Sequence, residues 1–135
     1  MHRGMWIPCL MLAVAAGWLL AQEGSGLQVD RAMVALAVES REPVGEASSF
    51  PADVERVFLF THIVGAQEET VVYHVWSHGP TERAKVLLPV RSNSWRTWSS
   101  KRILPSWTGP WTVEVQDELG NVLESVSFVI EEEGG

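Results

Sequence analysis

A chain of 135 residues, 46% of them apolar and 20% charged, has the size and composition of one globular domain. The formal net charge of −7 argues against nonspecific binding of nucleic acid by the whole surface. The single cysteine, Cys9, lies in the first apolar run, so the rest of the chain has no disulfide, no thiol nucleophile and no thiolate ligand for a metal.

The N-terminus has the features of an export signal. Arg3 supplies a positive charge, and residues 5–21 carry no charge at all. Because Ala21 is a small residue at the end of this run, residues 1–21 are predicted to be a signal peptide that is cut after Ala21. The run is also close to the length that crosses a bilayer, which leaves an uncleaved membrane anchor as the alternative.

The remainder divides into a linker, a domain and a tail. Residues 22–29 begin with small polar residues and are interpreted as a linker. Residues 30–131 show apolar residues that mostly alternate with polar ones, with turn residues at short intervals, which predicts an all-β domain. Residues 132–135 form an acidic, glycine-containing tail.

The first half of the domain predicts three strands. Residues 33–39 fit either a helix or a buried strand, and are interpreted as a strand. Residues 41–51 contain prolines, a glycine and serines, which indicates a surface connection anchored by Phe50. Residues 56–64 and 70–78 are expected to pair as a hairpin around the loop at 65–69.

The second half predicts four more strands. Residues 84–91 alternate, but Pro89 cannot donate a ladder hydrogen bond, so this strand is expected at a sheet edge or at a bulge. Residues 94–103 form a polar strand rich in tryptophan, and residues 111–116 and 122–130 form the clearest hairpin. About seven strands in about one hundred residues indicate an immunoglobulin-like antiparallel β-sandwich, an architecture that implies no function.

Five stretches, in their order along the chain, resemble a bacterial family of unknown function that is numbered 2914. They are REPVG at 41–45, FLFT at 58–61, HVW at 74–76, WRTWSSK at 95–101 and GPWTVEV at 109–115. The resemblance implies a β-rich domain of the bacterial envelope, periplasmic or extracellular, or anchored to the inner membrane if the N-terminal segment is uncut. It implies no activity.

The histidines beyond the predicted signal peptide are His62, His74 and His78. His74 and His78 would lie about 13 Å apart along one strand, too far to share a metal ion. If His62 paired near Val72, it would become a diagonal neighbour of His74, but no nearby carboxylate completes a set of three or four ligands. A structural role is favoured, and neither a metal nor another cofactor is expected.

The sequence contains no assembled catalytic set. It has no Gly-x-Ser-x-Gly motif and no phosphate-binding glycine loop, and its paired carboxylates lie in turns or in the tail. A protein without catalytic residues is therefore the leading interpretation, and an envelope hydrolase that uses His62 or His74 stays an alternative.

Basic charge is concentrated in one segment of the domain. From Arg83 to Val113 there are six lysines and arginines and no acidic residue. Trp95 and Trp98 face opposite sides of an unbroken strand, so at least one is expected to be exposed. Exposed tryptophan beside cations suits a sugar ring or a base that carries an acid group, but intramolecular cation–π pairs that finish a polar sheet face are slightly favoured. The predicted ligand-binding residues are Trp95, Arg96, Trp98, Lys101, Arg102 and Trp107.

The sequence thus favours a noncatalytic interaction domain of the bacterial envelope. A carbohydrate-binding module for an acidic glycan is the first alternative. The expected partners are an envelope protein or an anionic glycan, with no nucleic acid, and with membrane contact only through an uncleaved N-terminal segment. Trp76 and Trp111 alternate with apolar neighbours and are expected in the core.

Overall fold

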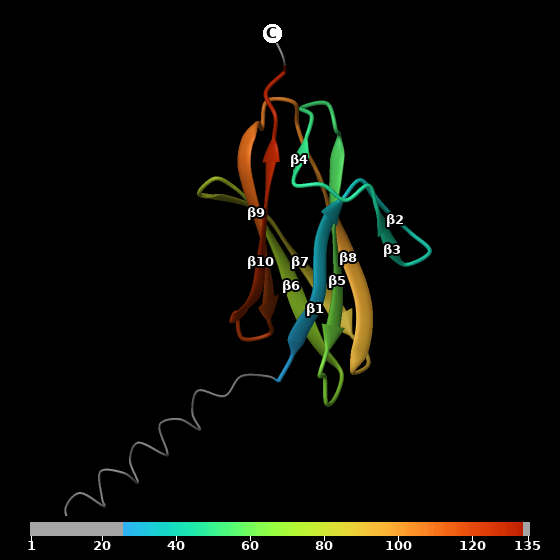
Figure 1. Cartoon of the computed structure of the whole chain (residues 1–135). Helices are drawn as coiled ribbons and strands as arrows, with labels where there is room; N and C mark the ends of the chain where they lie inside the picture. Colours follow the sequence, from blue (N-terminus) through green and yellow to red (C-terminus); the bar gives the residue numbers. More distant parts are fainter. Residues whose placement is uncertain (1–25, 134–135) are drawn as a thin grey trace, which may run out of the picture.

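The computed structural model describes residues 26–133, so the predicted signal peptide at 1–21 lies outside the described residues. Within this range, no helix is long and apolar enough to cross a membrane. The described residues form ten strands (Figure 1): β1 (Gln28–Ala35), β2 (Ala37–Glu39), β3 (Glu42–Val44), β4 (Ser49–Phe50), β5 (Arg56–Val64), β6 (Thr70–His78), β7 (Thr81–Val90), β8 (Ser94–Arg102), β9 (Gly109–Asp117) and β10 (Val122–Ile130).

Two sheets face each other and confirm the predicted all-β sandwich (Figure 1). One sheet has the strand order β1-β5-β8, and the other has the order β4-β10-β9-β6-β7. All pairs are antiparallel except β4 with β10. The short strands β2 and β3 form a separate hairpin beside the sandwich, so the seven long strands correspond to the seven that the sequence predicts.

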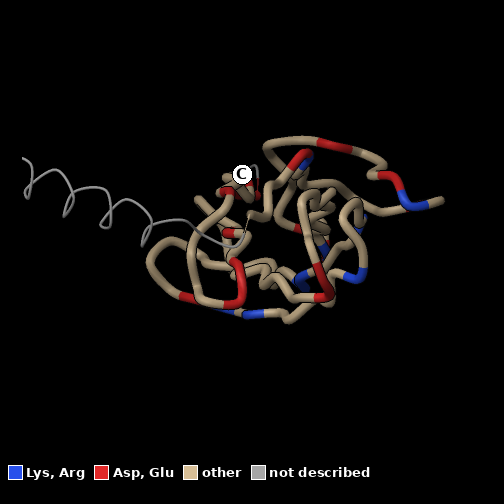
Figure 2. The backbone as a smooth tube through the Cα atoms, turned by 90° about the horizontal axis from the view of Figure 1, so that it is seen from below, with Lys and Arg blue, Asp and Glu red and all other residues tan. Residues whose placement is uncertain are grey.

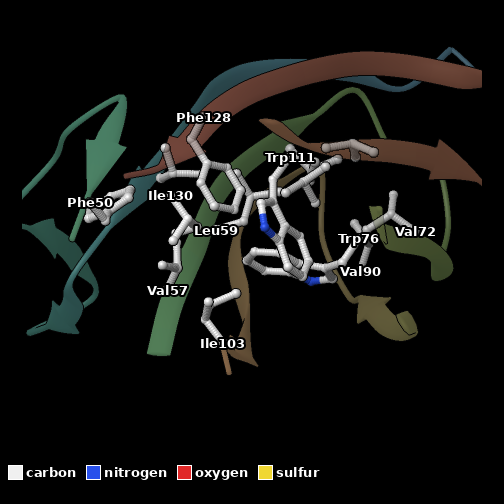
Figure 3. Close-up of a cluster of buried hydrophobic side chains, with 14 of the residues drawn as sticks. Phe50, Val57, Leu59, Val72, Trp76, Val90, Ile103, Trp111, Phe128 and Ile130 are labelled. Carbon is white, nitrogen blue, oxygen red and sulfur yellow. The ribbon is translucent and has the colours of Figure 1, made fainter. Parts of the chain in front are cut away.

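The core lies between the two sheets and follows from strand alternation, because every second residue of a strand faces the same side. Figure 3 shows Trp76 and Trp111 packed among aliphatic side chains from both sheets. Trp76 is fully buried, Trp111 is 1% exposed, and Phe128 stacks on Trp111 with ring centroids 5.9 Å apart. The prediction that both tryptophans are core residues is confirmed.

The predicted hairpin of residues 56–64 and 70–78 is wrong. Both strands have the predicted bounds, but β5 pairs with β1 and β8, whereas β6 pairs with β7 and β9. The loop between them crosses from one sheet to the other, beginning at Gly65 with a positive φ of 91°. Alternation shows that each strand buries one face, but it does not name the neighbouring strand.

The first predicted strand also differs from the structure. β1 begins at Gln28, inside the predicted linker, and ends at Ala35, so residues 33–39 are divided between β1 and β2. Leu27, at 7% exposure, is already part of the core. The predicted connection at 41–51 contains β3 and β4, and its expected anchor, Phe50, is buried at 2% exposure.

Two other expectations are confirmed. β7, which contains Pro89, is an edge strand, so the missing N–H of this proline breaks no ladder. β9 and β10 pair as the predicted hairpin, with Val113 opposite Val126 and Trp111 opposite Phe128.

Candidate functional site

The six predicted binding residues lie in three places. On β8, Trp95 and Lys101 share the inward-facing side with Ser99, which contacts His74 of the opposite sheet. Trp95 is half-buried against the core. Arg96, Trp98 and Arg102 lie on the outer side of β8, and Trp107 lies in the loop between β8 and β9. Trp95, Arg96 and Trp98 nevertheless line one small pocket of about 180 Å³ with Pro89 and Thr97, whereas Lys101 contacts Trp107 and Arg102 lines a different hollow.

Arg96 and Trp98 lie beside the β2–β3 hairpin. The Glu42 carboxylate accepts hydrogen bonds from Arg31 at 3.1 and 3.2 Å and lies 3.0 Å from the Arg96 guanidinium. The Arg31 hydrogen bonds hold the pKa of Glu42 below its usual value. The Trp98 ring stacks on Phe60, with centroids 6.4 Å apart. The charge of Arg96 and one face of Trp98 are thus engaged within the molecule.

Four cations lie close together at one end of the sandwich, where Arg56, Arg83 and Arg102 act on the charge of Lys101, and we call these four residues the basic end cluster. Arg83 and Lys101 lie over the Trp107 ring, 4.6 and 5.3 Å from its centroid. Arg56 and Arg102 stand opposite each other on the paired strands β5 and β8. None of the four has a carboxylate within 4.0 Å in the described part of the chain.

A β-bulge explains how Arg83 reaches this cluster from the other sheet. The register of β6 with β7 shifts between the pairs Trp76–Ala84 and Ser77–Glu82, which leaves Arg83 as the extra residue of a β-bulge. A bulge re-aims the side chain of its extra residue. Arg83 therefore meets Trp107 instead of continuing the alternation of β7.

The neighbouring cations make the charged form of Lys101 less favourable. Its pKa is lowered, first by burial and then by the positive charges of Arg56, Arg83 and Arg102. A group of like charges without a direct ion pair is unfavourable in the free protein, and a bound anion would relieve the repulsion. The basic end cluster is thus suited to hold an anion.

The Trp107 loop is fixed to the core. The Trp107 carbonyl accepts a hydrogen bond from the Trp111 indole at 3.0 Å, and the Trp107 N–H donates to Leu104 at 2.9 Å. The His78 ring stacks on Trp111 at 4.8 Å and donates from Nε2 to the Thr108 carbonyl at 2.7 Å. Trp107 is therefore a rigid support for the two cations above it.

A hollow of about 650 Å³ opens beside the basic end cluster. Glu55, on its rim, has a positive φ of 69°, and the Arg56 N–H donates to the Val54 carbonyl at 2.8 Å, which closes a γ-turn centred on Glu55. This form of γ-turn is rare and strained for a residue other than glycine. The hollow is lined by Ala52, Asp53, Glu55, Arg56, Arg102, Ile103, Leu104 and Pro105.

A chain of hydrogen bonds crosses the sandwich at His74, which is fully buried. The Thr61 hydroxyl donates to the Thr97 carbonyl at 2.8 Å, so it accepts from His74 Nε2 at 3.2 Å. His74 Nδ1 then accepts from the Ser99 hydroxyl at 2.6 Å, and Ser99 accepts from the Trp76 indole at 3.1 Å. Every member has a partner, and burial lowers the pKa of His74 to about 3.

A second histidine, His62, lies on the outer side of the three-stranded sheet. Its Nδ1 lies 2.9 Å from the Asp30 carboxylate, and its Nε2 lies 2.8 Å from the Ser94 hydroxyl. These three residues come from the adjacent strands β1, β5 and β8. The order acid, imidazole and hydroxyl is that of a serine hydrolase triad.

The condition for a metal bridge between His62 and His74 is not met. It required His62 to pair near Val72, but these residues belong to strands of different sheets. Among residues 26–133, no three His, Cys, Asp or Glu side chains are grouped closely enough to hold a metal ion.

Sequence reasoning brought together Lys101, Arg102 and Trp107 but missed Arg56 and the rim of the hollow. Arg56 is 45 positions before Lys101 and becomes its neighbour only through the pairing of β5 with β8. Arg83 had a signal, since it begins the segment without acidic residues. The strained turn at Glu55 has no signature in the sequence.

Comparison with known proteins finds one family. Residues 69–130 match a family model described as a protein of unknown function (DUF2914). The match confirms the family resemblance over these residues, whereas the stretches at 41–45 and 58–61 lie before it. A search of curated proteins found no match. Arg83, Lys101, Arg102 and Trp107 fall inside the matched range, and Arg56 falls outside it.

Proposed function

We propose that this chain, whose residues 69–130 carry the domain of unknown function 2914, is a noncatalytic interaction domain of the bacterial envelope that binds an anionic partner. One observation carries the proposal: four cations lie close together, two of them over a fixed tryptophan, and none of the four has a carboxylate within 4.0 Å among the described residues. The proposed location follows from the export signal predicted at residues 1–21.

Charge distribution supports selective binding. The chain has a net charge of −7, and the view along the sandwich shows acidic and basic residues interspersed around the backbone (Figure 2). Nonspecific attraction of polyanions is weak for such a protein, because its overall field is negative. An anion is instead attracted locally, where several positive charges lie together and none has a carboxylate within 4.0 Å in the described part of the chain.

Other cations of the domain, unlike those of the basic end cluster, are paired with a carboxylate. Arg31 and Arg96 share the Glu42 carboxylate and so have little charge to offer a partner. The basic end cluster combines several cations with an adjoining hollow, which is the arrangement expected of a binding site.

Binding to isolated bacterial envelopes tests this proposal. The double variant Arg56→Gln, Arg102→Gln should bind at least tenfold more weakly than the parent, because charged hydrogen bonds are removed. Arg91→Gln is the matched control, since Arg91 is exposed and follows the opposite end of β7. Equal binding by the parent and the double variant, with both folded, contradicts the proposal.

Export is tested separately. If residues 1–21 are a cleaved signal, the protein purified from the exported fraction of its host begins at Gln22 in N-terminal sequencing. Recovery of the intact N-terminus in the membrane fraction supports the uncleaved anchor instead. Recovery only in the cytoplasm contradicts the envelope assignment.

A second candidate function, hydrolysis of an ester, is favoured by the contacts of His62. With Nδ1 protonated, His62 donates to Asp30 and accepts from the Ser94 hydroxyl, which is the polarity needed to activate Ser94 as a nucleophile. This candidate ranks second because Asp30 is 55% exposed and none of these residues lines the hollow beside the basic end cluster.

A fluorophosphonate probe tests the hydrolase candidate. If His62 activates Ser94, the probe labels Ser94 in the parent, and labelling is lost in His62→Gln. His78→Gln is the control, because His78 packs on Trp111 at the other end of the sandwich. Absence of labelling in the folded parent removes the candidate.

A further inference from the structure

We propose that the hollow beside the basic end cluster binds an acidic sugar, with its acid group on Arg56 and Arg102 and its hydroxyls on Asp53 and Glu55. This inference rests on the proposed function, because it names the ligand of the same site. It goes further by separating a sugar from a simple anion.

The charged residues that line the hollow favour a sugar acid over a simple anion. A simple inorganic anion needs cations and N–H donors, and carboxylates in its site would repel it. Here Asp53 and Glu55 line the same hollow as Arg56 and Arg102. A sugar acid fits both kinds of group, because its hydroxyls donate hydrogen bonds and its carboxylate accepts them from guanidinium.

The apolar lining residues and the volume of the hollow also fit a sugar ring. The remaining lining residues are Ala52, Ile103, Leu104 and Pro105, so the polar groups are set against an apolar surface. Such a surface suits the C–H face of a sugar ring and offers nothing to a hydrated ion. The volume of about 650 Å³ lies within the usual range for small-molecule sites, roughly 300 to 1,000 Å³.

The strained turn at Glu55 is a further sign of a binding site. A residue with a side chain at a φ of 69° is held there at a cost, and such positions concentrate at binding sites. The turn is locked because the Ile103 N–H donates to the Glu55 carbonyl at 2.8 Å. This geometry fixes Glu55 and Arg56 as neighbours on the rim of one hollow.

Arg83 and Lys101 extend the site beyond the hollow. Both lie over the Trp107 ring, so their charges are within about 10 Å of each other. An arginine stacked on an aromatic ring keeps its in-plane N–H donors available. These two cations are placed to receive the next acid group of a polymer, which favours a glycan with repeated acid groups over a single acidic sugar.

Titration with oligogalacturonate, the matching neutral galactose oligomer and inorganic phosphate tests the inference, with Trp fluorescence and backbone NMR shifts as the readouts. Oligogalacturonate should bind and shift residues 52–56 and 102–105, whereas the neutral oligomer should not bind. Arg102→Gln should weaken binding at least tenfold, and Arg91→Gln should leave it unchanged. Phosphate that binds as tightly as the oligosaccharide overturns the inference.

Two substitutions of Glu55 sharpen the test. Glu55→Gln should weaken binding of the oligosaccharide but leave any binding of phosphate unchanged. Glu55→Gly should raise the melting temperature, because glycine adopts positive φ without strain, and should also weaken sugar binding. If both variants bind the oligosaccharide like the parent, Glu55 does not contact the sugar and the inference fails.

The outcomes separate this inference from the proposed function. If the double variant Arg56→Gln, Arg102→Gln loses binding to envelopes but the parent ignores oligogalacturonate, the sugar assignment fails and the interaction domain stands. If the double variant binds envelopes like the parent, the site itself is wrong and both proposals fail.

Discussion

At the scale of single residues, His74 shows how a buried polar group can be fully satisfied. Its two ring nitrogens meet the hydroxyls of Thr61 and Ser99, which come from the opposite sheet. Neutral histidine donates from one nitrogen and accepts at the other, and this matches the partners. Protonation would place a second donor against Ser99, whose hydroxyl would have to turn while the charge remained buried.

We predict that His74 makes the fold sensitive to acid. Its pKa is about 3 in the folded protein, against an ordinary value near 6.5, so the unfolded chain binds the proton first as the pH falls. Its contribution is constant above about pH 6.5 and declines by up to about 1.4 kcal/mol per pH unit from there towards pH 3. Urea unfolding at pH 7, 6, 5 and 4 measures this slope.

His74→Gln is the informative variant. It should lose about 1 to 3 kcal/mol at pH 7, because buried partners are left unpaired, and its stability should fall less steeply with acid than that of the parent. His62→Gln, at a partly exposed histidine, is the control. Parallel pH curves for the parent and His74→Gln would show that His74 is not the titrating group.

Gly65 is predicted to tolerate a side chain less well than Gly109. Gly65 and Gly109 both have positive φ, but a Cβ at Gly65 would meet the Gly26 carbonyl oxygen at 2.5 Å, whereas a Cβ at Gly109 meets no atom within 4 Å. Gly109→Ala should cost about 1 to 2 kcal/mol for the conformation alone, and Gly65→Ala should cost more. Chemical denaturation compares the two, and equal costs would contradict the close approach.

At the scale of elements, the β2–β3 hairpin is a satellite of the sandwich. It turns at Ser40 and Arg41, both with positive φ, and Glu42 connects it to Arg31 and Arg96. Its ion pairs are partly exposed, so they contribute modestly to global stability. Their local effect is to hold the hairpin beside the three-stranded sheet.

We predict that Glu42→Gln loosens this hairpin without unfolding the domain. Amide hydrogen exchange of residues 37–44 should accelerate, while exchange of β5 and β9 should stay as in the parent. The lowered pKa of Glu42 means that its protonation needs a lower pH than that of an ordinary glutamate, and the same local opening is then expected in the parent. Glu124→Gln, at an exposed residue of β10, is the control.

The elements also show where sequence reasoning is strong and where it stops. The bounds of β5, β6 and β10 and the burial of Trp76, Trp111 and Phe50 were predictable, because alternation and turn residues are local signals. The pairing partner of each strand was not predictable, because local sequence signals favour a β5–β6 hairpin and a β5–β8 pair equally. The site depended on that pairing, so Arg56 was missed.

At the scale of the whole molecule, the basic end cluster lies at the end of the sandwich opposite to the first described residues. Figure 1 shows the described chain entering at one end and the C-terminal strand finishing at the other. Arg56, Arg83 and Arg102 sit near the start of β5, the start of β7 and the end of β8, which share that far end.

Trp111 couples the core to this site. Its ring stacks on Phe128 and His78, and its indole N–H donates to Trp107, so it holds the loop that carries the basic end cluster. The domain has no disulfide, since Cys9 is the only cysteine, and its stability therefore depends on such packing. Loss of this side chain should affect the fold and the site together.

Trp111→Ala should cost about 3 to 5 kcal/mol, a large part of the roughly 5 to 15 kcal/mol that small domains have. Trp111→Phe should cost less, because it keeps an aromatic ring in the stack, while it loses the hydrogen bond to the Trp107 loop and part of the buried ring volume. Val129→Ala, at a residue 44% exposed, should change little. Urea unfolding followed by circular dichroism ranks the three, and a free energy for Trp111→Ala near that of Val129→Ala would contradict the burial of Trp111. If Trp111→Phe stays folded yet binds anions more weakly, the Trp107 loop must be held in place for the cluster to function.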